Sequence, residues 1–94
     1  MNNEDDLLAA TRRASRAKLL VEDEIIVEAF KALERAYHDG WAQSELHESK
    51  KRDTMYLALQ VLGDVQKHLM DVISNGVIAQ SELEAFAAKY RKAA

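Results

Sequence analysis

Apolar residues recur at helical spacing through the middle of this chain. From position 24 to position 44, spacings of four, three, four and four residues place them on one face of a helix: Ile26, Phe30, Leu33, Tyr37 and Trp41. Asp23 precedes this run, and its carboxylate can accept hydrogen bonds from the free amides of a first helical turn. The pattern therefore predicts a helix over residues 24–44.

A broader apolar pattern follows after a polar stretch at residues 47–53. It predicts a helix over residues 51–74, with a stripe formed by Met55, Leu59, Leu62, Leu69 and Ile73. Asn75 and Gly76 then give a stop signal, because glycine tolerates the left-handed conformation that ends many helices. Ser81 and Glu84 fit a capping box, which predicts a separate short helix over residues 81–92.

The first helix is expected over residues 5–20, with acidic residues at its start and basic residues later, as the helix dipole favours. Its apolar positions are mostly small, so we expect it either to be partly mobile or to need a partner surface that orders it. The two long helices are each too short to indicate a free-standing coiled coil.

Composition supports an all-α fold. The 94 residues include no proline, no cysteine and only three glycines, so few positions interrupt regular structure. We expect a small helical bundle built on a central antiparallel two-helix hairpin, with shorter flanking helices. A single domain over residues 1–94 is expected, with residues 1–4 disordered.

The net charge of −3 conceals an uneven distribution. Residues 21–49 are strongly acidic, whereas residues 1–20 and 50–68 are more basic. This pattern suits pairing within the fold or with another copy, although solvated helix faces would give it too. No apolar run is long enough for a membrane span, and the acidic N-terminus does not resemble a signal peptide. A cytoplasmic or virion location is expected.

Candidate chemistry is sparse. Glu34 and His38 are four residues apart, as are Asp64 and His68, whereas di-iron helical bundles use glutamate and histidine three apart. The sequence shows no nucleophile elbow and no phosphate-binding glycine loop. We therefore expect no enzyme activity, no metal site and no cofactor.

Two basic clusters offer an alternative function. The first lies in the first helix, and the second begins the helix at 51. They consist of Arg12, Arg13 and Arg16, and of Lys50, Lys51 and Arg52. Both could contact phosphates without reading base sequence. Nucleic-acid binding, as in an accessory DNA-packaging protein, is the alternative reading.

The preferred reading is contact between proteins. Tyrosine and tryptophan are enriched at interfaces, and Tyr37 and Trp41 lie one turn apart, where we expect them to stack. The alternative for Tyr37, Trp41 and Tyr56 is a position in the core or at its edge. The predicted interface residues are Tyr37, Trp41, Arg12, Arg13 and Arg16.

Two blocks of residues carry a resemblance. One runs from Arg16-Ala17-Lys18 to Trp41, and the other runs from Arg52-Asp53 through His68-Leu69 to Gly76. Over residues 16–80 they resemble small helical proteins encoded among the virion-structure genes of tailed bacteriophages and prophages. The resemblance implies a role in virion assembly and transfers no activity or site residue. A homo-oligomer or contact with other phage structural proteins is expected, and inhibition of a host protein is a further alternative.

Overall fold

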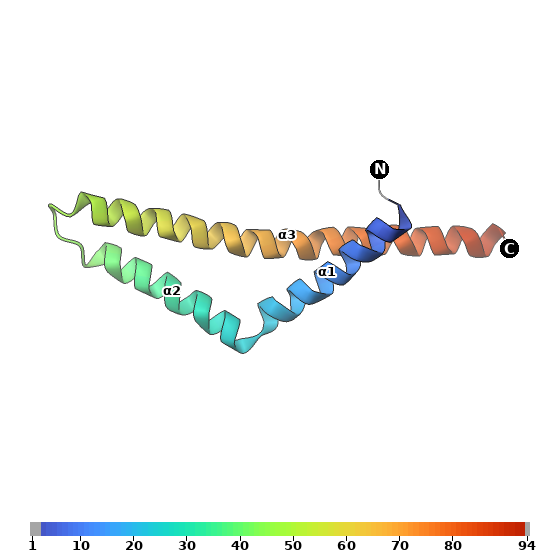
Figure 1. The fold of residues 1–94 in the computed structure, drawn as a ribbon, viewed down its shortest axis with the longest axis horizontal. Coiled ribbons are helices and arrows are strands. Elements are labelled where there is room, and N and C mark those ends of the chain that lie inside the picture. Colours follow the sequence, from blue (N-terminus) through green and yellow to red (C-terminus); the bar gives the residue numbers. More distant parts are fainter. Residues whose placement is uncertain (1–2, 94) are drawn as a thin grey trace. The chain divides into compact units, whose positions relative to one another are not determined.

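The computed structural model describes residues 3–93, and the side chains of residues 3–91. These residues form three helices and no strand (Figure 1): α1 over Glu4–Glu22, α2 over Glu24–Ala42 and α3 over Ser49–Ala93. The predicted all-α class is confirmed. Of the expected disorder at residues 1–4, the first two residues lie outside the described part, while the Asn3 side chain accepts a hydrogen bond from Asp6 N at 2.9 Å and Glu4 begins α1.

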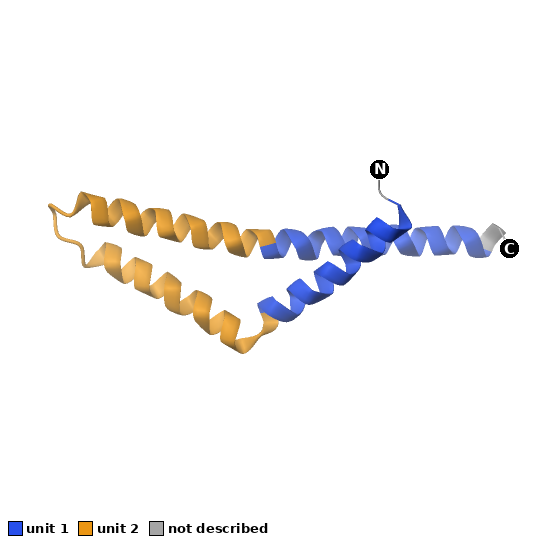
Figure 2. Cartoon of the chain, viewed as in Figure 1, with its two compact units in different colours: residues 1–21, 69–94 blue, residues 22–68 orange. Residues whose placement is uncertain are grey.

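The chain divides into two compact units (Figure 2). Unit 1 contains residues 1–21 and 69–94, so it combines α1 with the later part of α3. Unit 2 contains residues 22–68, so it combines α2 with the earlier part of α3. Each unit therefore has its own pair of helices, and α3 supplies one helix to both.

The start of α2 is the predicted one. Asp23 has an extended backbone, and its Oδ1 accepts hydrogen bonds from Ile25 N at 2.9 Å and from Ile26 N at 3.2 Å. These two amides have no partner within the helix, because the first turn of a helix always leaves its N–H groups free. Asp23 is thus the N-cap that separates α1 from α2.

Replacing this cap is expected to weaken α2. Asp23→Ala leaves both amides to water and is expected to lower the free energy of unfolding by about 1 kcal/mol. Asp23→Asn retains an acceptor oxygen, so it is expected to cost only a few tenths of a kcal/mol. Urea denaturation of the two variants side by side measures the difference, and equal stability of both variants would contradict the capping role.

The predicted stop at Asn75 and Gly76 is wrong, and so is the separate helix over residues 81–92. α3 continues without a break from Ser49 to Ala93, and none of the described glycines has a positive φ. Gly76 is buried, and a Cβ built on it would lie 1.9 Å from Ala14 Cβ and 3.1 Å from the Ala10 carbonyl oxygen. Glycine is therefore used here for the close approach of α1, rather than for a left-handed turn.

A seven-residue repeat explains why α3 is continuous. Two apolar rows run along it, one of Met55, Leu62, Leu69, Gly76, Leu83 and Tyr90, and one of Ala58, Val65, Val72, Ala79 and Phe86. They occupy the a and d positions of a heptad pattern, in which residues of both rows face a partner helix. The pattern passes through Asn75-Gly76 without a change of phase, so the packing face continues where the local stop signal would end the helix.

The partner helices carry matching rows. In α1 the row alternates in steps of three and four residues and is mostly small: Leu7, Ala10, Ala14, Ala17 and Val21. In α2 the same alternation gives Ile26, Phe30, Leu33, Tyr37 and Gly40. Within unit 1, Ala17 and Ala79 are buried, and in unit 2 Leu62 is buried. These buried residues therefore all lie on the heptad rows, although Val65 and Leu33 on the same rows are exposed, and in unit 1 the buried residues have small side chains.

Candidate functional site

A cavity with a volume of about 560 Å³ lies in unit 2, between α2 and α3. Residues of α2 on its wall are Glu34, His38 and Trp41, and those of α3 are Tyr56, Leu59, Gln60, Leu62, Gly63 and Gln66. We call this cavity the unit 2 groove. Leu62 is buried, whereas Trp41 and Tyr56 leave 52% and 62% of their surface exposed. The groove thus presents two large aromatic side chains to solvent.

The two aromatic residues predicted for the interface lie one turn apart on α2 and have different surroundings. Trp41 lines the unit 2 groove, whereas Tyr37 is half-buried on the heptad row of α2. The expected stacking of the two rings is wrong, and the close ring pair in the described residues is Phe86 with Tyr90, at 4.6 Å between centroids and an interplanar angle of 53°. Tyr56 is the other aromatic residue that lines the groove.

The arginines predicted for the interface lie on α1, in unit 1. Arg12, Arg13 and Arg16 are all exposed. They lie outside the small-residue row of α1 that packs on α3. Their side chains are thus free to meet phosphate groups or an acidic protein surface, and the geometry of α1 does not distinguish the two.

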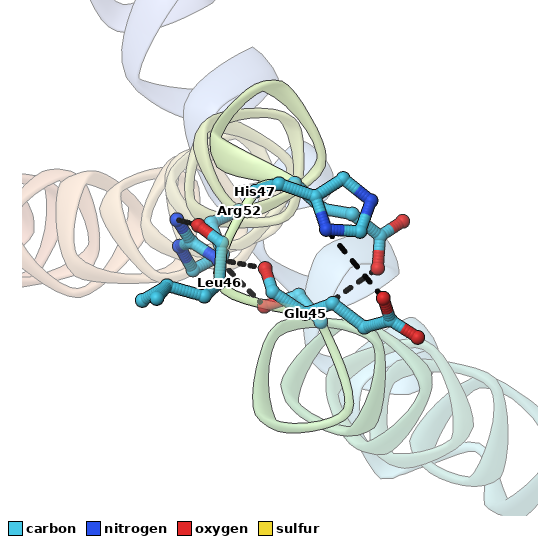
Figure 3. Close-up of polar contacts among 6 residues, drawn as sticks. Glu45, Leu46, His47 and Arg52 are labelled. Atoms are coloured by element: carbon cyan, nitrogen blue, oxygen red, sulfur yellow. Dashed lines mark hydrogen bonds and ion pairs between the residues drawn. The ribbon is translucent and has the colours of Figure 1, made fainter.

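The second basic cluster lies in the first turn of α3, and its three residues differ in exposure and contacts. Lys50 and Lys51 are exposed, but Arg52 is half-buried and reaches back into the loop, as Figure 3 shows. Its Nη1 donates to Glu45 O at 2.5 Å and to Ser44 Oγ at 3.4 Å, and its Nη2 donates to Leu46 O at 3.1 Å. The guanidinium satisfies carbonyl groups that the chain leaves free after α2. Arg52 therefore holds the loop in shape, with both of its terminal nitrogens bonded within the loop.

Other polar contacts complete this loop. Glu48 Oε1 accepts a hydrogen bond from Glu45 N at 2.8 Å, and Ser44 Oγ donates to Trp41 O at 2.6 Å. His47 Nδ1 lies 3.5 Å from Glu45 Oε2, with both side chains largely exposed. The loop is therefore an ordered connection between two helices, and the contacts of Glu45, His47 and Glu48 are those of a turn.

Two smaller cavities lie between α1 and α3 in unit 1. One has a volume of about 440 Å³ and is lined by Thr11, Ala14, Ser15 and Lys18 of α1 and by Ile73, Gly76, Val77, Gln80, Ser81 and Glu84 of α3. The other has a volume of about 250 Å³ and lies between Asp6, Leu7 and Ala10 of α1 and Asn75, Ile78, Ala79 and Glu82 of α3. Both mark the edges of the contact that Gly76 makes possible.

The sequence predicts no metal site and no membrane-spanning helix. Over residues 3–93, no group of three or more histidine, cysteine, aspartate or glutamate side chains is placed to hold a metal ion. Glu34 and His38 do line the same groove, but without a third such side chain. Within the same residues, no helix combines the length and the apolar character that crossing a bilayer requires.

Comparison with known proteins adds no further constraint on function. No family model, no curated protein and no solved structure matches the chain.

The heptad repeat that runs through the whole of α3 was not predicted from the sequence. Its last apolar residues, Phe86 and Tyr90, are 44% and 64% exposed. A search at a spacing of seven residues would have found the repeat, because these two residues continue the rows that begin at Met55 and Ala58.

Proposed function

We propose that this chain is a non-enzymatic protein–protein contact module that associates with copies of itself through exposed apolar helix faces. One observation carries the proposal: among the described residues the buried apolar set is Ala17, Leu62 and Ala79, whereas most large apolar side chains are exposed. Soluble monomers seldom leave extended apolar patches open to water. Association with a second copy would remove this surface from solvent and add to a thin core.

The unit 2 groove is the first interface candidate. Trp41 and Tyr56 combine large apolar area with a polar group, the side-chain character that is enriched in interface anchors. Leu57 and Val61, which lie on α3 like Tyr56, are 63% and 54% exposed. An antiparallel hairpin of α2 with the earlier part of α3 is part of this proposal, since it would present both aromatic residues from one scaffold.

The biological setting of the proposal comes from the resemblance. In a bacteriophage or prophage, a small helical module of this kind would serve virion assembly, as one part of a homo-oligomer or bound to another structural protein. Capture of a host protein is the alternative setting. Nucleic-acid binding is the second candidate function, and the exposure of Arg12, Arg13, Arg16, Lys50 and Lys51 favours it.

The molar mass in solution tests the proposal. By light scattering we expect a mass above that of the 10.6 kDa chain, with little change between low and high salt, because apolar contacts are not screened by ions. Trp41→Ala is expected to raise the dissociation constant about tenfold or more. The control is Leu46→Ala, which removes an apolar side chain that is 94% exposed in the loop and lies outside the groove.

Two results would count against self-association. A monomer at both salt concentrations would exclude it over the range of protein concentration measured. DNA binding that weakens steeply as salt rises, and that is lost on charge reversal at Arg12, Arg13 and Arg16, would favour the nucleic-acid reading instead.

A further inference from the structure

The two walls of the unit 2 groove differ in charge. The wall on α3 consists of uncharged residues, among them Tyr56, Leu59 and Leu62. The wall on α2 carries Glu34 and His38 beside Trp41. A surface that covers this groove therefore has to offer apolar contact to α3 and charged partners to α2.

Charged residues alternate in sign along α2 where it borders the groove. Lys31 precedes Glu34 by three residues, so the two side chains share one side of the helix. Glu28 and Arg35 are seven residues apart and form the next row of the helix surface, on the side away from the heptad row. All four side chains are exposed. In chain order the charges are negative, positive, negative and positive. Reversing the direction of the helix inverts this order, so α2 is complementary to an antiparallel copy of itself.

From this charge order we infer that two copies pair groove to groove, with their α2 helices antiparallel. Lys31 of each copy lies opposite Glu34 of the other, and Glu28 of each copy lies beside Arg35 of the other. A twofold axis midway between Lys31 and Glu34 relates the copies, so each contact occurs twice. The uncharged α3 walls then meet as well, and unit 2 of the two copies forms a four-helix bundle. At each end of this contact, Trp41 of one copy lies over the first turn of α2 of the other.

Charge distinguishes this arrangement from the other way of placing two grooves face to face. With the twofold axis along the helices, α2 of each copy would face α3 of the other. Lys31 and Glu34 would then lie against uncharged residues, and withdrawing a charge from water without a partner costs free energy. In the antiparallel pair the α3 walls supply apolar attraction and the charges of α2 select the orientation. The inference rests on the proposed self-association and hairpin, and it assigns them one surface and one orientation.

Charge reversal in separate chains tests the pairing. Lys31→Glu and Glu34→Lys each bring like charges together at two places about the axis, and each is expected to raise the dissociation constant of the dimer about 3- to 10-fold. When the two variants are mixed in equal amounts, a Lys31→Glu chain meets a Glu34→Lys chain with opposite charges at both places. The mixture is expected to dimerise with a dissociation constant close to that of the unchanged chain. A contact within one helix cannot produce this rescue between chains.

Lys50→Glu is the matched control for Lys31→Glu. It makes the same charge change at an exposed lysine of α3 that does not line the groove. We expect it to leave the dissociation constant unchanged. Sedimentation velocity over a range of protein concentrations measures all of these constants, and circular dichroism of each variant checks that the helix content is kept.

A disulfide reports the orientation directly. The chain has no cysteine, so chains carrying Glu24→Cys and chains carrying Ala42→Cys can be mixed and oxidised. These positions are the two ends of α2, and the antiparallel pair brings opposite ends of the two copies together. Identical positions lie about 25 Å apart in such a pair. We therefore expect mixed disulfides in excess over disulfides between identical chains.

The outcomes separate this inference from the proposed function. A chain that is monomeric throughout overturns both. A dimer whose dissociation constant ignores both charge reversals, or two variants that do not rescue each other on mixing, overturns the antiparallel groove pairing and leaves self-association standing through another surface. The same conclusion follows if mixed disulfides are no more abundant than random pairing gives.

Discussion

Gly76→Ala is expected to destabilise unit 1, although alanine is the better helix former. The substitution improves the intrinsic helix propensity of α3 by about 1 kcal/mol. Its new Cβ, however, would lie 1.9 Å from Ala14 Cβ, far inside contact distance, so α1 must move away. Because the core of unit 1 consists of small side chains, such a shift opens the contacts of Ala17 and Ala79 together. We expect a net loss of about 2 kcal/mol or more.

A second glycine of the same helix provides the control. A Cβ built on Gly63 meets nothing within 4 Å. Gly63→Ala therefore has only the gain in helix propensity and is expected to raise the free energy of unfolding by about 0.5–1 kcal/mol. The two variants make the same chemical change and are expected to shift the urea midpoint in opposite directions.

A compensating variant tests the cause. Adding Ala14→Gly to Gly76→Ala removes the methyl group that the new Cβ would strike, and it is expected to recover part of the loss, less the cost of a glycine in α1. Hydrogen exchange of the α1 amides is the local measurement, since α1 belongs to unit 1. Unchanged exchange in Gly76→Ala would show that α1 is not held against Gly76.

Local signals in the sequence were sufficient for α1 and α2. Asp23 interrupts the apolar pattern, and its carboxylate caps α2 as expected because the interaction involves only neighbouring residues. Local signals could not predict where α3 ends. The conformation of Gly76 depends on Ala10 and Ala14, more than sixty residues away along the chain, and this tertiary contact overrides the local preference of Asn75-Gly76.

The candidate site was likewise predictable only in part. The enrichment of tryptophan at interfaces led to the prediction that Trp41 is a contact residue, and in the structure it is half exposed in the unit 2 groove. The pattern could not assign the partner of Arg52, because the loop carbonyls that it binds acquire their positions only when α2 and α3 are joined. Charge alone placed Arg52 with Lys50 and Lys51, whereas the structure uses its guanidinium within the loop.

Leu62→Ala is expected to have the largest effect in unit 2. Leu62 is 9% exposed, and among the described residues it is the one large buried side chain, since Ala17 and Ala79 are the others. Truncating a buried leucine costs about 2–5 kcal/mol, and the open groove beside Leu62 favours the lower end of this range because water can enter the space. Trp41, the single tryptophan of the chain, lines the same groove, so its fluorescence follows the unfolding of unit 2 directly.

Leu57→Ala makes the same chemical change as Leu62→Ala, but at an exposed position. Leu57 lies on the same helix and in the same unit but is 63% exposed, so its truncation is expected to change the stability of the monomer by less than about 0.5 kcal/mol. If Leu57 contributes to association, its loss appears only as the protein concentration rises, whereas the effect of Leu62→Ala persists at high dilution. Equal effects of the two variants at every concentration would mean that α2 and α3 do not pack on Leu62. A loss that is confined to Leu62→Ala would make the heptad row of α3 the core of unit 2 and leave Leu57 outside that core.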